Sequence, residues 1–179
     1  PMSHFIQFLT YFRILIATVI FLLITLGDLY SWALCLFLLA SISDYWDGFL
    51  ARKFNLESTI GEVLDPIADK ILVTFIILAL SIELSSMFIG MVGGLMLVRE
   101  FWVGALRDIN ARQGTSDSTK VSFLAKIKTS VQFITFSSYL IGLVLDNSLI
   151  LFLSNFLLFL SLIITFQTGL SYTIATFKR

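Results

Sequence analysis

Residues 148–172 read SLILFLSNFLLFLSLIITFQTGLSY and contain no charged side chain. A helix of this length measures about 37 Å, enough to cross the roughly 30 Å hydrocarbon core of a bilayer. The whole chain has the same character, since 58% of its 179 residues are hydrophobic and 13% are charged. A soluble domain carries about 25% charged residues. The composition therefore predicts an integral membrane protein and gives no support to a basic, water-exposed domain that binds nucleic acid.

Six segments are long and apolar enough to be transmembrane helices. They cover residues 12–27, 30–51, 63–83, 86–107, 124–145 and 148–172. Turn-forming pairs such as Gly27-Asp28 and Asp146-Asn147 separate them. No repeat or low-complexity linker divides the chain, so we expect one all-α transmembrane domain over residues 2–179. Pro1, which precedes Met2, is interpreted as a cloning remnant.

The N-terminal residues suggest a further element before the first span. Phe5, Phe8, Leu9 and Phe12 recur at helical spacing. This pattern predicts a short amphipathic helix that lies in the membrane interface. The alternative is that these residues simply begin the first span.

Charge is distributed unevenly between the two sides of the predicted bundle. With six spans, both termini share one side with the connections at 52–60 and 108–123. All twelve Lys and Arg residues fall on or toward that side. The turns on the opposite side hold only Asp28, Glu83 and Asp146. The positive-inside rule therefore predicts that both termini are cytoplasmic.

Four aspartates lie in the predicted second and third spans, as the pairs Asp44 with Asp47 and Asp65 with Asp69. Separations of three and four residues place each pair on one helix face, and the two helices are antiparallel neighbours. A charged side chain at membrane depth costs on the order of 3 kcal/mol on insertion scales. The cluster must therefore be neutralised, and grouped oxygen ligands suit Mg²⁺ or Mn²⁺.

A structural interpretation of the second pair stays open. Asp65 precedes Pro66 and is suited to be a helix N-cap, with Asp69 in the first turn, where the helix dipole favours carboxylates. This capping interpretation does not account for Asp44 and Asp47. Both follow an apolar run near a helix C-terminus, where the helix dipole disfavours carboxylates. Small residues around both pairs leave room for a ligand, although helix packing also uses small residues.

The residues around the aspartates follow the pattern DxxDGxxAR, then eight residues, then GxxxDxxxD. The matching positions are Asp44, Asp47, Gly48, Ala51, Arg52, Gly61, Asp65 and Asp69. This pattern is the signature of the CDP-alcohol phosphotransferases, and the chain resembles that family. The resemblance implies a six-span membrane enzyme, usually a homodimer. Such enzymes move a phosphoryl-linked group from a CDP-linked donor to an alcohol and release CMP.

Other stretches are similar to the bacterial phosphatidylglycerophosphate synthases within this family. REFWVGALR (residues 99–107) resembles their REFxxSGLR, LAKIKTSVQ (124–132) their LGKxKTxxQ, and FLTYFR (8–13) their LTxxR. The chain departs from the family at Ile6-Gln7, where the relatives have Pro-Asn, and at Gly104-Ala105, where they have Ser-Gly. The resemblance implies that CDP-diacylglycerol is the donor and sn-glycerol 3-phosphate the acceptor.

The resemblance also implies roles for individual residues. Metal ligands are Asp44, Asp47, Asp65 and Asp69, of which Asp69 is also the general base. The donor nucleotide is bound by Thr10, Gly48, Ala51, Arg52 and Gly61. Arg99 and Arg107, two turns apart and expected on nearly the same helix face, bind the acceptor phosphate with Lys126 and Lys128. For Arg107 and the two lysines, ordinary positive-inside charge is the alternative.

Rival functions remain open at this point. Within the family, a cardiolipin synthase would use phosphatidylglycerol as acceptor, and other members use inositol phosphate or serine. Outside it, a cation or proton transporter also carries intramembrane carboxylates, usually near the midplane between repeated halves. The family resemblance implies a bacterial cytoplasmic membrane, with an organelle of bacterial ancestry as the alternative.

Overall fold

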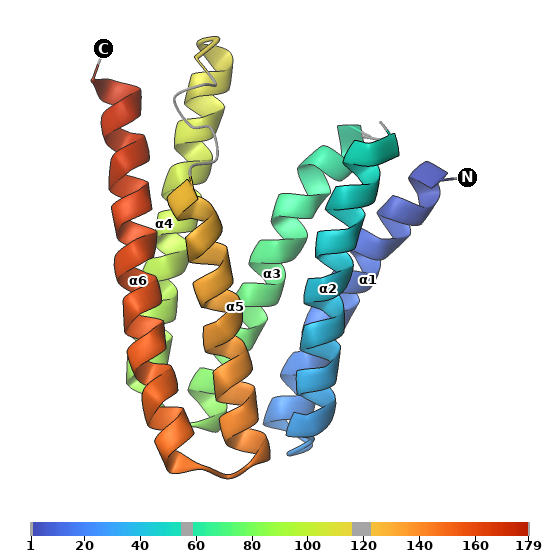
Figure 1. Cartoon of the computed structure of the whole chain (residues 1–179), viewed down its shortest axis with the longest axis vertical. Helices are drawn as coiled ribbons and strands as arrows, with labels where there is room; N and C mark the ends of the chain where they lie inside the picture. Colours follow the sequence, from blue (N-terminus) through green and yellow to red (C-terminus); the bar gives the residue numbers. More distant parts are fainter. Residues whose placement is uncertain (1, 55–58, 116–122, 179) are drawn as a thin grey trace.

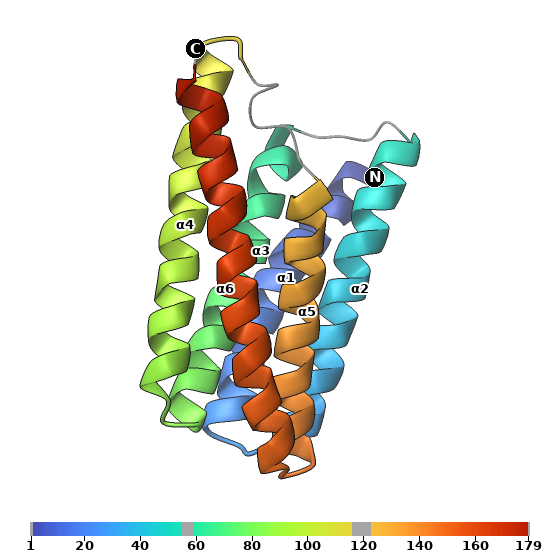
Figure 2. The ribbon, with the colours of Figure 1, turned by 60° about the vertical axis from the view of Figure 1, so that its left-hand side comes forward.

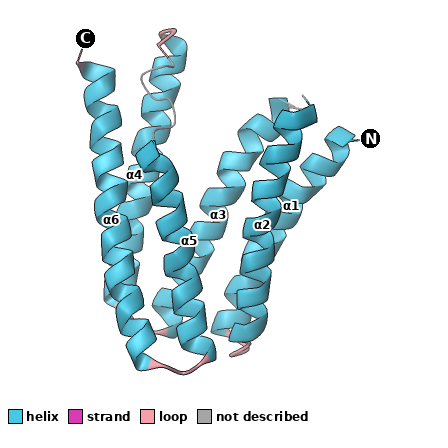
Figure 3. Ribbon diagram, in the orientation of Figure 1, coloured by secondary structure: helices cyan, strands magenta, loops and turns pink. Residues whose placement is uncertain are grey.

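A computed structural model describes residues 2–54, 59–115 and 123–178, with side chains for 11–43, 67–115, 123, 124 and 126–178. This part of the chain is helical throughout, with short connecting turns (Figure 3). Its helices are α1 (Met2–Thr25), α2 (Tyr30–Phe54), α3 (Thr59–Glu83), α4 (Met87–Arg112), α5 (Phe123–Val144) and α6 (Ser148–Phe177). They coincide with the six predicted segments apart from a few residues at most ends, and the prediction of an all-α fold is confirmed.

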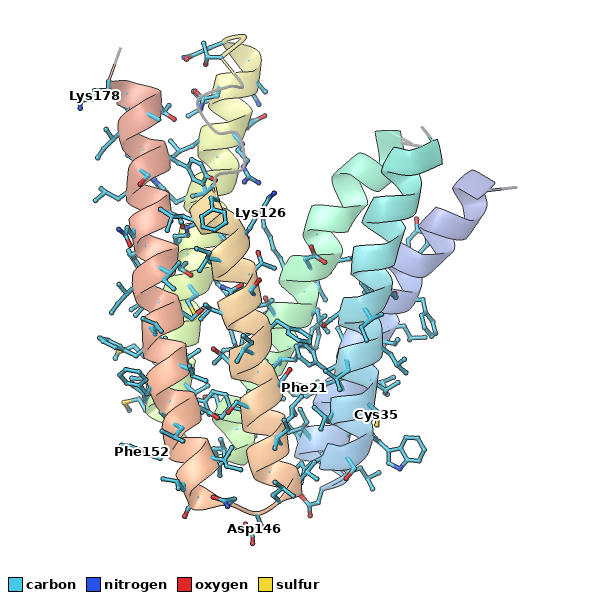
Figure 4. All side chains as sticks on the ribbon, viewed as in Figure 1. Phe21, Cys35, Lys126, Asp146, Phe152 and Lys178 are labelled. Carbon is cyan, nitrogen blue, oxygen red and sulfur yellow. The ribbon has the colours of Figure 1, made fainter. Side chains whose placement is uncertain are left out.

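Several helices have the length and composition of membrane spans. Within the described residues, Met87–Arg112, Lys126–Val144 and Ser148–Phe177 are long and apolar enough to cross a bilayer. Shorter apolar stretches, Tyr11–Thr25 and Tyr30–Ser43, lie in α1 and α2. Large apolar side chains also cover the outer surface, as for Phe152, Phe156 and Phe159 on α6; Figure 4 shows Phe152 pointing away from the bundle. Such a surface matches lipid rather than water, so the chain is a multi-pass membrane protein.

The N-terminal segment differs from the prediction of a separate interfacial helix. Helix α1 runs without interruption from Met2 to Thr25. The apolar residues Phe5, Phe8, Leu9 and Phe12 keep the helical spacing of the span that follows, and neither glycine nor proline occurs between Met2 and Gly27 to end the helix. These residues therefore form the first turns of α1, which is the alternative that the sequence left open.

Three tight turns join the helices at one end of the bundle. Each contains a residue with positive φ, namely Asp28 (49°), Ser85 (45°) and Asp146 (47°). This left-handed residue lets the chain reverse directly after a helix, and polar residues tolerate it better than apolar ones. Asn147 then caps α6, because its side chain accepts hydrogen bonds from Leu149 N and Ile150 N. The turns predicted near residues 28, 84 and 146 are confirmed.

The helices pack in a closed ring. In spatial order, α1 contacts α2, then follow α5, α6, α4 and α3, which contacts α1 again. Figure 1 shows α1, α2 and α3 approaching α4, α5 and α6 at the end with the tight turns and diverging from them at the end that carries both termini. The view in Figure 2 shows α5 beside both α2 and α6.

Apolar side chains hold the ring together at its narrow end. Ile20 and Ile24 of α1 and Ile76 and Leu80 of α3 are completely buried in the same cluster. Burying such a side chain contributes on the order of 2 kcal/mol. The helices therefore separate only toward the end with the termini, where charged residues replace aliphatic ones.

Candidate active site

A cavity of about 940 Å³ lies between the helices α1 to α5. Among its apolar lining residues are Phe37, Leu72, Met96, Phe133 and Phe136. Its charged lining residues are Arg13, Asp69, Lys70, Glu100, Arg107 and Lys128. Four of these are cationic and two anionic, so the described wall carries excess positive charge.

The charged and apolar residues occupy different depths. On α4, Arg107 lies closer than Met96 to the end of the bundle that carries the termini, and on α5 Lys128 lies closer to it than Phe133. The ring of Phe37 on α2 stacks on that of Phe133, with centroids 5.5 Å apart, and thereby helps to hold α2 against α5. The cavity therefore has an apolar interior and a charged mouth.

Arg13 and Asp69 form an ion pair across the cavity wall. Nη1 of Arg13 on α1 donates a hydrogen bond to Oδ1 of Asp69 on α3 at 3.0 Å. The Arg13 side chain is 2% exposed, whereas that of Asp69 is 53% exposed. The predicted catalytic carboxylate is thus accessible from the cavity while its partner is enclosed by the helices.

For the remaining aspartates of the signature, the structure describes only the positions of the backbone. Asp44 follows Ala40 by four residues on α2, and Asp65 precedes Asp69 by four on α3; Ala40 and Asp69 both line the cavity. The backbone at Asp44 and Asp65 therefore lies about one helical turn beyond these lining residues, toward the end of the bundle that carries the termini. The side chains of the predicted ligands Asp44, Asp47 and Asp65 and of the predicted nucleotide-binding residues Thr10, Gly48, Ala51, Arg52 and Gly61 lie outside the described residues.

Arg99 points away from the cavity and toward α6. Its side chain is buried, and Nη2 donates a hydrogen bond to Thr168 Oγ1 at 2.5 Å. Gly169 provides the space, since a Cβ there would lie 3.1 Å from the Cγ of Arg99. Arg99 is not among the residues that line the cavity in the described part of the chain.

Helical periodicity explains why Arg99 and Arg107 do not share a face. Residues eight apart are rotated by about 80° from each other on an α-helix, whereas residues seven apart differ by about 20°. Glu100, seven residues before Arg107, therefore shares the cavity face with it, and both line the cavity. The expectation that Arg99 and Arg107 lie on nearly the same face is corrected accordingly.

The other predicted acceptor residues differ in position. Lys128 lines the cavity, and its Nζ donates to Glu100 Oε1 at 2.5 Å. The Arg107 guanidinium carbon lies 5.9 Å from the ring centroid of Tyr172 on α6, within cation–π range. Lys126 is exposed near the end of α5 that is closest to the termini (Figure 4) and is not among the described lining residues.

Three charged lining residues were not among the predicted site residues: Arg13, Lys70 and Glu100. Arg13 and Glu100 lie inside the family-like stretches FLTYFR and REFWVGALR, and Lys70 directly follows the signature residue Asp69. Arg13 is also a charged residue within an apolar span, a signal that by itself points to a functional or paired side chain. The sequence therefore contained a signal for all three.

The arrangement is suited to a ligand with both apolar and anionic parts. Its volume lies in the range of roughly 300–1,000 Å³ typical of small-molecule sites. The apolar interior can accept hydrocarbon, and the cations at the mouth can bind phosphate groups. Such a cavity in a multi-pass helical membrane protein is suited to an amphipathic, anionic ligand.

Comparison with known proteins identifies the family. The sequence pattern of the CDP-alcohol phosphatidyltransferase family matches residues 4–167, and the chain belongs to this family. A Rickettsia typhi relative is 36% identical over 176 residues, which cover 96% of both chains. A Rickettsia bellii relative is 41% identical over 138 residues (76% of this chain, 74% of its own). A Wigglesworthia glossinidia brevipalpis relative is 32% identical over 161 residues (87% and 88%). All three are named CDP-diacylglycerol–glycerol-3-phosphate 3-phosphatidyltransferase.

Proposed function

We propose that the protein transfers the phosphatidyl group of CDP-diacylglycerol to sn-glycerol 3-phosphate and forms phosphatidylglycerophosphate and CMP, a step of anionic phospholipid biosynthesis. The shared name of relatives that cover up to 96% of the chain carries this proposal. The cavity supports it independently, because its apolar interior suits acyl chains and its cationic mouth suits phosphate groups. Residues 2–179 would act as one domain.

The donor would bind with its diphosphate at the charged mouth. Its acyl chains would occupy the apolar interior or the adjacent lipid, which fixes the diphosphate at the depth of Asp69 and Arg13. The signature residues Thr10, Gly48, Ala51, Arg52 and Gly61 would surround the nucleotide. The small residues among them leave space for a ligand to approach the backbone.

The acidic residues fit a divalent cation. Asp69 offers hard carboxylate oxygen at the cavity wall, the ligand type that Mg²⁺ and Mn²⁺ prefer. Asp44, Asp47, Asp65 and Asp69 would together hold one or two such ions. When bound, the metal would stabilise negative charge on the diphosphate and on departing CMP.

Asp69 would act as the general base. Its carboxylate takes the proton of the attacking hydroxyl, and that oxygen forms a bond to the phosphorus attached to diacylglycerol. The bond from this phosphorus to the bridging oxygen of CMP breaks, and CMP leaves with the electron pair. Arg13 would orient the carboxylate through the ion pair at 3.0 Å.

Arg107 and Lys128 would bind the phosphate of the acceptor, because both line the cavity. Lys126 would attract the anion at the mouth of the cavity. Arg99 would act indirectly, through its ion pair with Glu100. The separation of these roles follows from which helix face each residue occupies.

The mouth of the cavity would face the cytoplasm of a bacterial cell, with the protein a homodimer in the inner membrane. Charge supports this orientation: Lys126 and Lys178 lie toward the end with the termini, whereas Asp146 lies at the opposite end (Figure 4). Positive charge accumulates on the cytoplasmic side of membrane proteins.

A release assay tests the proposal. Purified protein would be incubated with CDP-diacylglycerol, Mg²⁺ and either glycerol 3-phosphate, phosphatidylglycerol, inositol phosphate or serine, and CMP would be measured. We expect CMP release with glycerol 3-phosphate and none from the Asp69→Asn variant. Release with phosphatidylglycerol but not with glycerol 3-phosphate would overturn the proposed acceptor.

A further inference from the structure

Glu100 joins two cations that face different directions. Its Oε1 accepts a hydrogen bond from Arg99 Nη1 at 2.8 Å and another from Lys128 Nζ at 2.5 Å. The side chains of Glu100 and Lys128 are only 22% and 13% exposed. Ion pairs with this little solvent contact have defined geometry and are weakly screened by salt.

The Glu100 carboxylate is itself held in place through Arg99 by a residue of α6. Arg99 is held by Thr168 of α6, whose hydroxyl in turn donates to Thr165 O at 2.9 Å. A continuous series of polar contacts therefore runs from α6 through Arg99 and Glu100 on α4 to Lys128 on α5. It ends at the cavity wall, where Lys128 and Arg107 both lie.

We propose that Glu100 is a positioning residue that holds the Lys128 ammonium group at the cavity wall for the phosphate of the acceptor. This inference rests on the proposed function, in which Lys128 and Arg107 bind that phosphate. A lysine ammonium has three hydrogen-bond donors on a flexible stem. One donor bonded to Glu100 fixes the stem and leaves two for an anion.

Two features favour positioning over simple charge neutralisation of Arg99. Glu100 lines the cavity, whereas Arg99 does not, so the carboxylate lies on the side of the substrate. The shared oxygen Oε1 also joins α4 to α5, the two helices that supply the proposed phosphate ligands. If Glu100 served only to stabilise Arg99, its contact with Lys128 would have no consequence for the acceptor.

A double-mutant cycle separates these roles. The variants are Glu100→Gln, Lys128→Met and the combination, and KM and kcat are measured for glycerol 3-phosphate and for CDP-diacylglycerol. Glu100→Gln should raise the acceptor KM about tenfold, the size typical of losing an orienting partner, and leave the donor KM unchanged. The double variant should be no worse than Lys128→Met alone, because Glu100 acts through Lys128.

Controls keep the inference testable. Asp108→Asn changes a carboxylate on the same helix whose pair with Arg112 is exposed, and it should leave both KM values unchanged. Glu100→Asp retains the negative charge and should recover part of the affinity for glycerol 3-phosphate that Glu100→Gln loses. It also serves as a second variant in case Glu100→Gln folds poorly. Calorimetric titration of the solubilised protein with glycerol 3-phosphate gives a second readout that does not need turnover.

The outcomes distinguish this inference from the proposed function. An active wild type in which Glu100→Gln leaves the acceptor KM unchanged, or in which the effects of the two substitutions add fully, overturns the positioning role alone. A wild-type protein that neither binds nor converts glycerol 3-phosphate overturns both.

Discussion

The ion pair between Arg13 and Asp69 connects a buried cation to an accessible carboxylate. Nη1 of Arg13 lies 3.0 Å from Oδ1 of Asp69, yet the two side chains are 2% and 53% exposed. The guanidinium is enclosed by helices, so its position is set by packing. The carboxylate at the cavity wall therefore has a fixed partner on the first helix and is exposed to the cavity.

Replacing Arg13 should impair turnover more than substrate binding. We expect Arg13→Met to lower kcat at least tenfold, because the Asp69 carboxylate loses the group that orients it. Arg13→Lys should retain part of the activity, since a lysine keeps the charge but not the planar donor geometry. Steady-state CMP release measures both. Equal kcat values for the wild type and Arg13→Met would contradict the orienting role.

Asp69→Asn should abolish turnover and spare donor binding. An amide keeps the shape of the side chain but cannot accept the proton of the attacking hydroxyl, and general-base catalysis contributes about 10²–10⁴-fold. The test compares CMP release with equilibrium binding of CDP-diacylglycerol in the same detergent. Turnover close to the wild-type rate would show that another group takes the proton.

Removal of divalent metal should stop the reaction reversibly. The four proposed aspartate ligands would need cations to remain charged at membrane depth, and the diphosphate would add further negative charge. Dialysis against EDTA should reduce CMP release to background, and Mg²⁺ or Mn²⁺ should restore it. Full activity after metal removal, verified by elemental analysis, would refute metal dependence.

Thr168→Val should destabilise the protein through Arg99. The substitution keeps the shape of the threonine but removes the oxygen that accepts from Arg99 Nη2, and a hydrogen bond to a charged group contributes about 1.5–3 kcal/mol. The matched control is Ser171→Ala on the same helix, whose exposed hydroxyl donates a hydrogen bond to Gln167 O within α6. Thermal unfolding in detergent should show a lower midpoint for Thr168→Val alone. Equal midpoints for the two variants would argue against this anchor.

Adjacent glycines on α4 should respond differently to alanine. A Cβ at Gly93 would overlap Ile77 of α3, whereas one at Gly94 meets nothing within 4 Å. Gly93→Ala should therefore cost about 1–3 kcal/mol through overpacking between α3 and α4. Gly94→Ala should be neutral or slightly stabilising, because alanine favours the helix. Comparable unfolding midpoints would mean that α3 and α4 separate easily at this point.

Much of the fold could be predicted from local sequence. Long apolar segments and turn-forming residues located all six helices, because helix length and backbone reversal depend on neighbouring residues. The prediction of a separate interfacial helix was wrong because the same local pattern, an apolar face at helical spacing, also describes the start of a longer helix. Asp69, Arg107 and Lys128 were singled out by their motifs, and all three line the cavity.

The sequence by itself determined the composition of a membrane protein, the positions of its helices and turns, and the family signature around Asp44 and Asp69. Only the tertiary structure decided which charges face the cavity. Arg99 and Glu100 are neighbours in the chain, but successive residues of a helix point about 100° apart. Because α6 and the cavity adjoin different faces of α4, Arg99 is buried against Thr168, while Glu100 meets Lys128 at the cavity wall. Their different surroundings are set by helix packing between residues distant in the chain, which no local pattern contains.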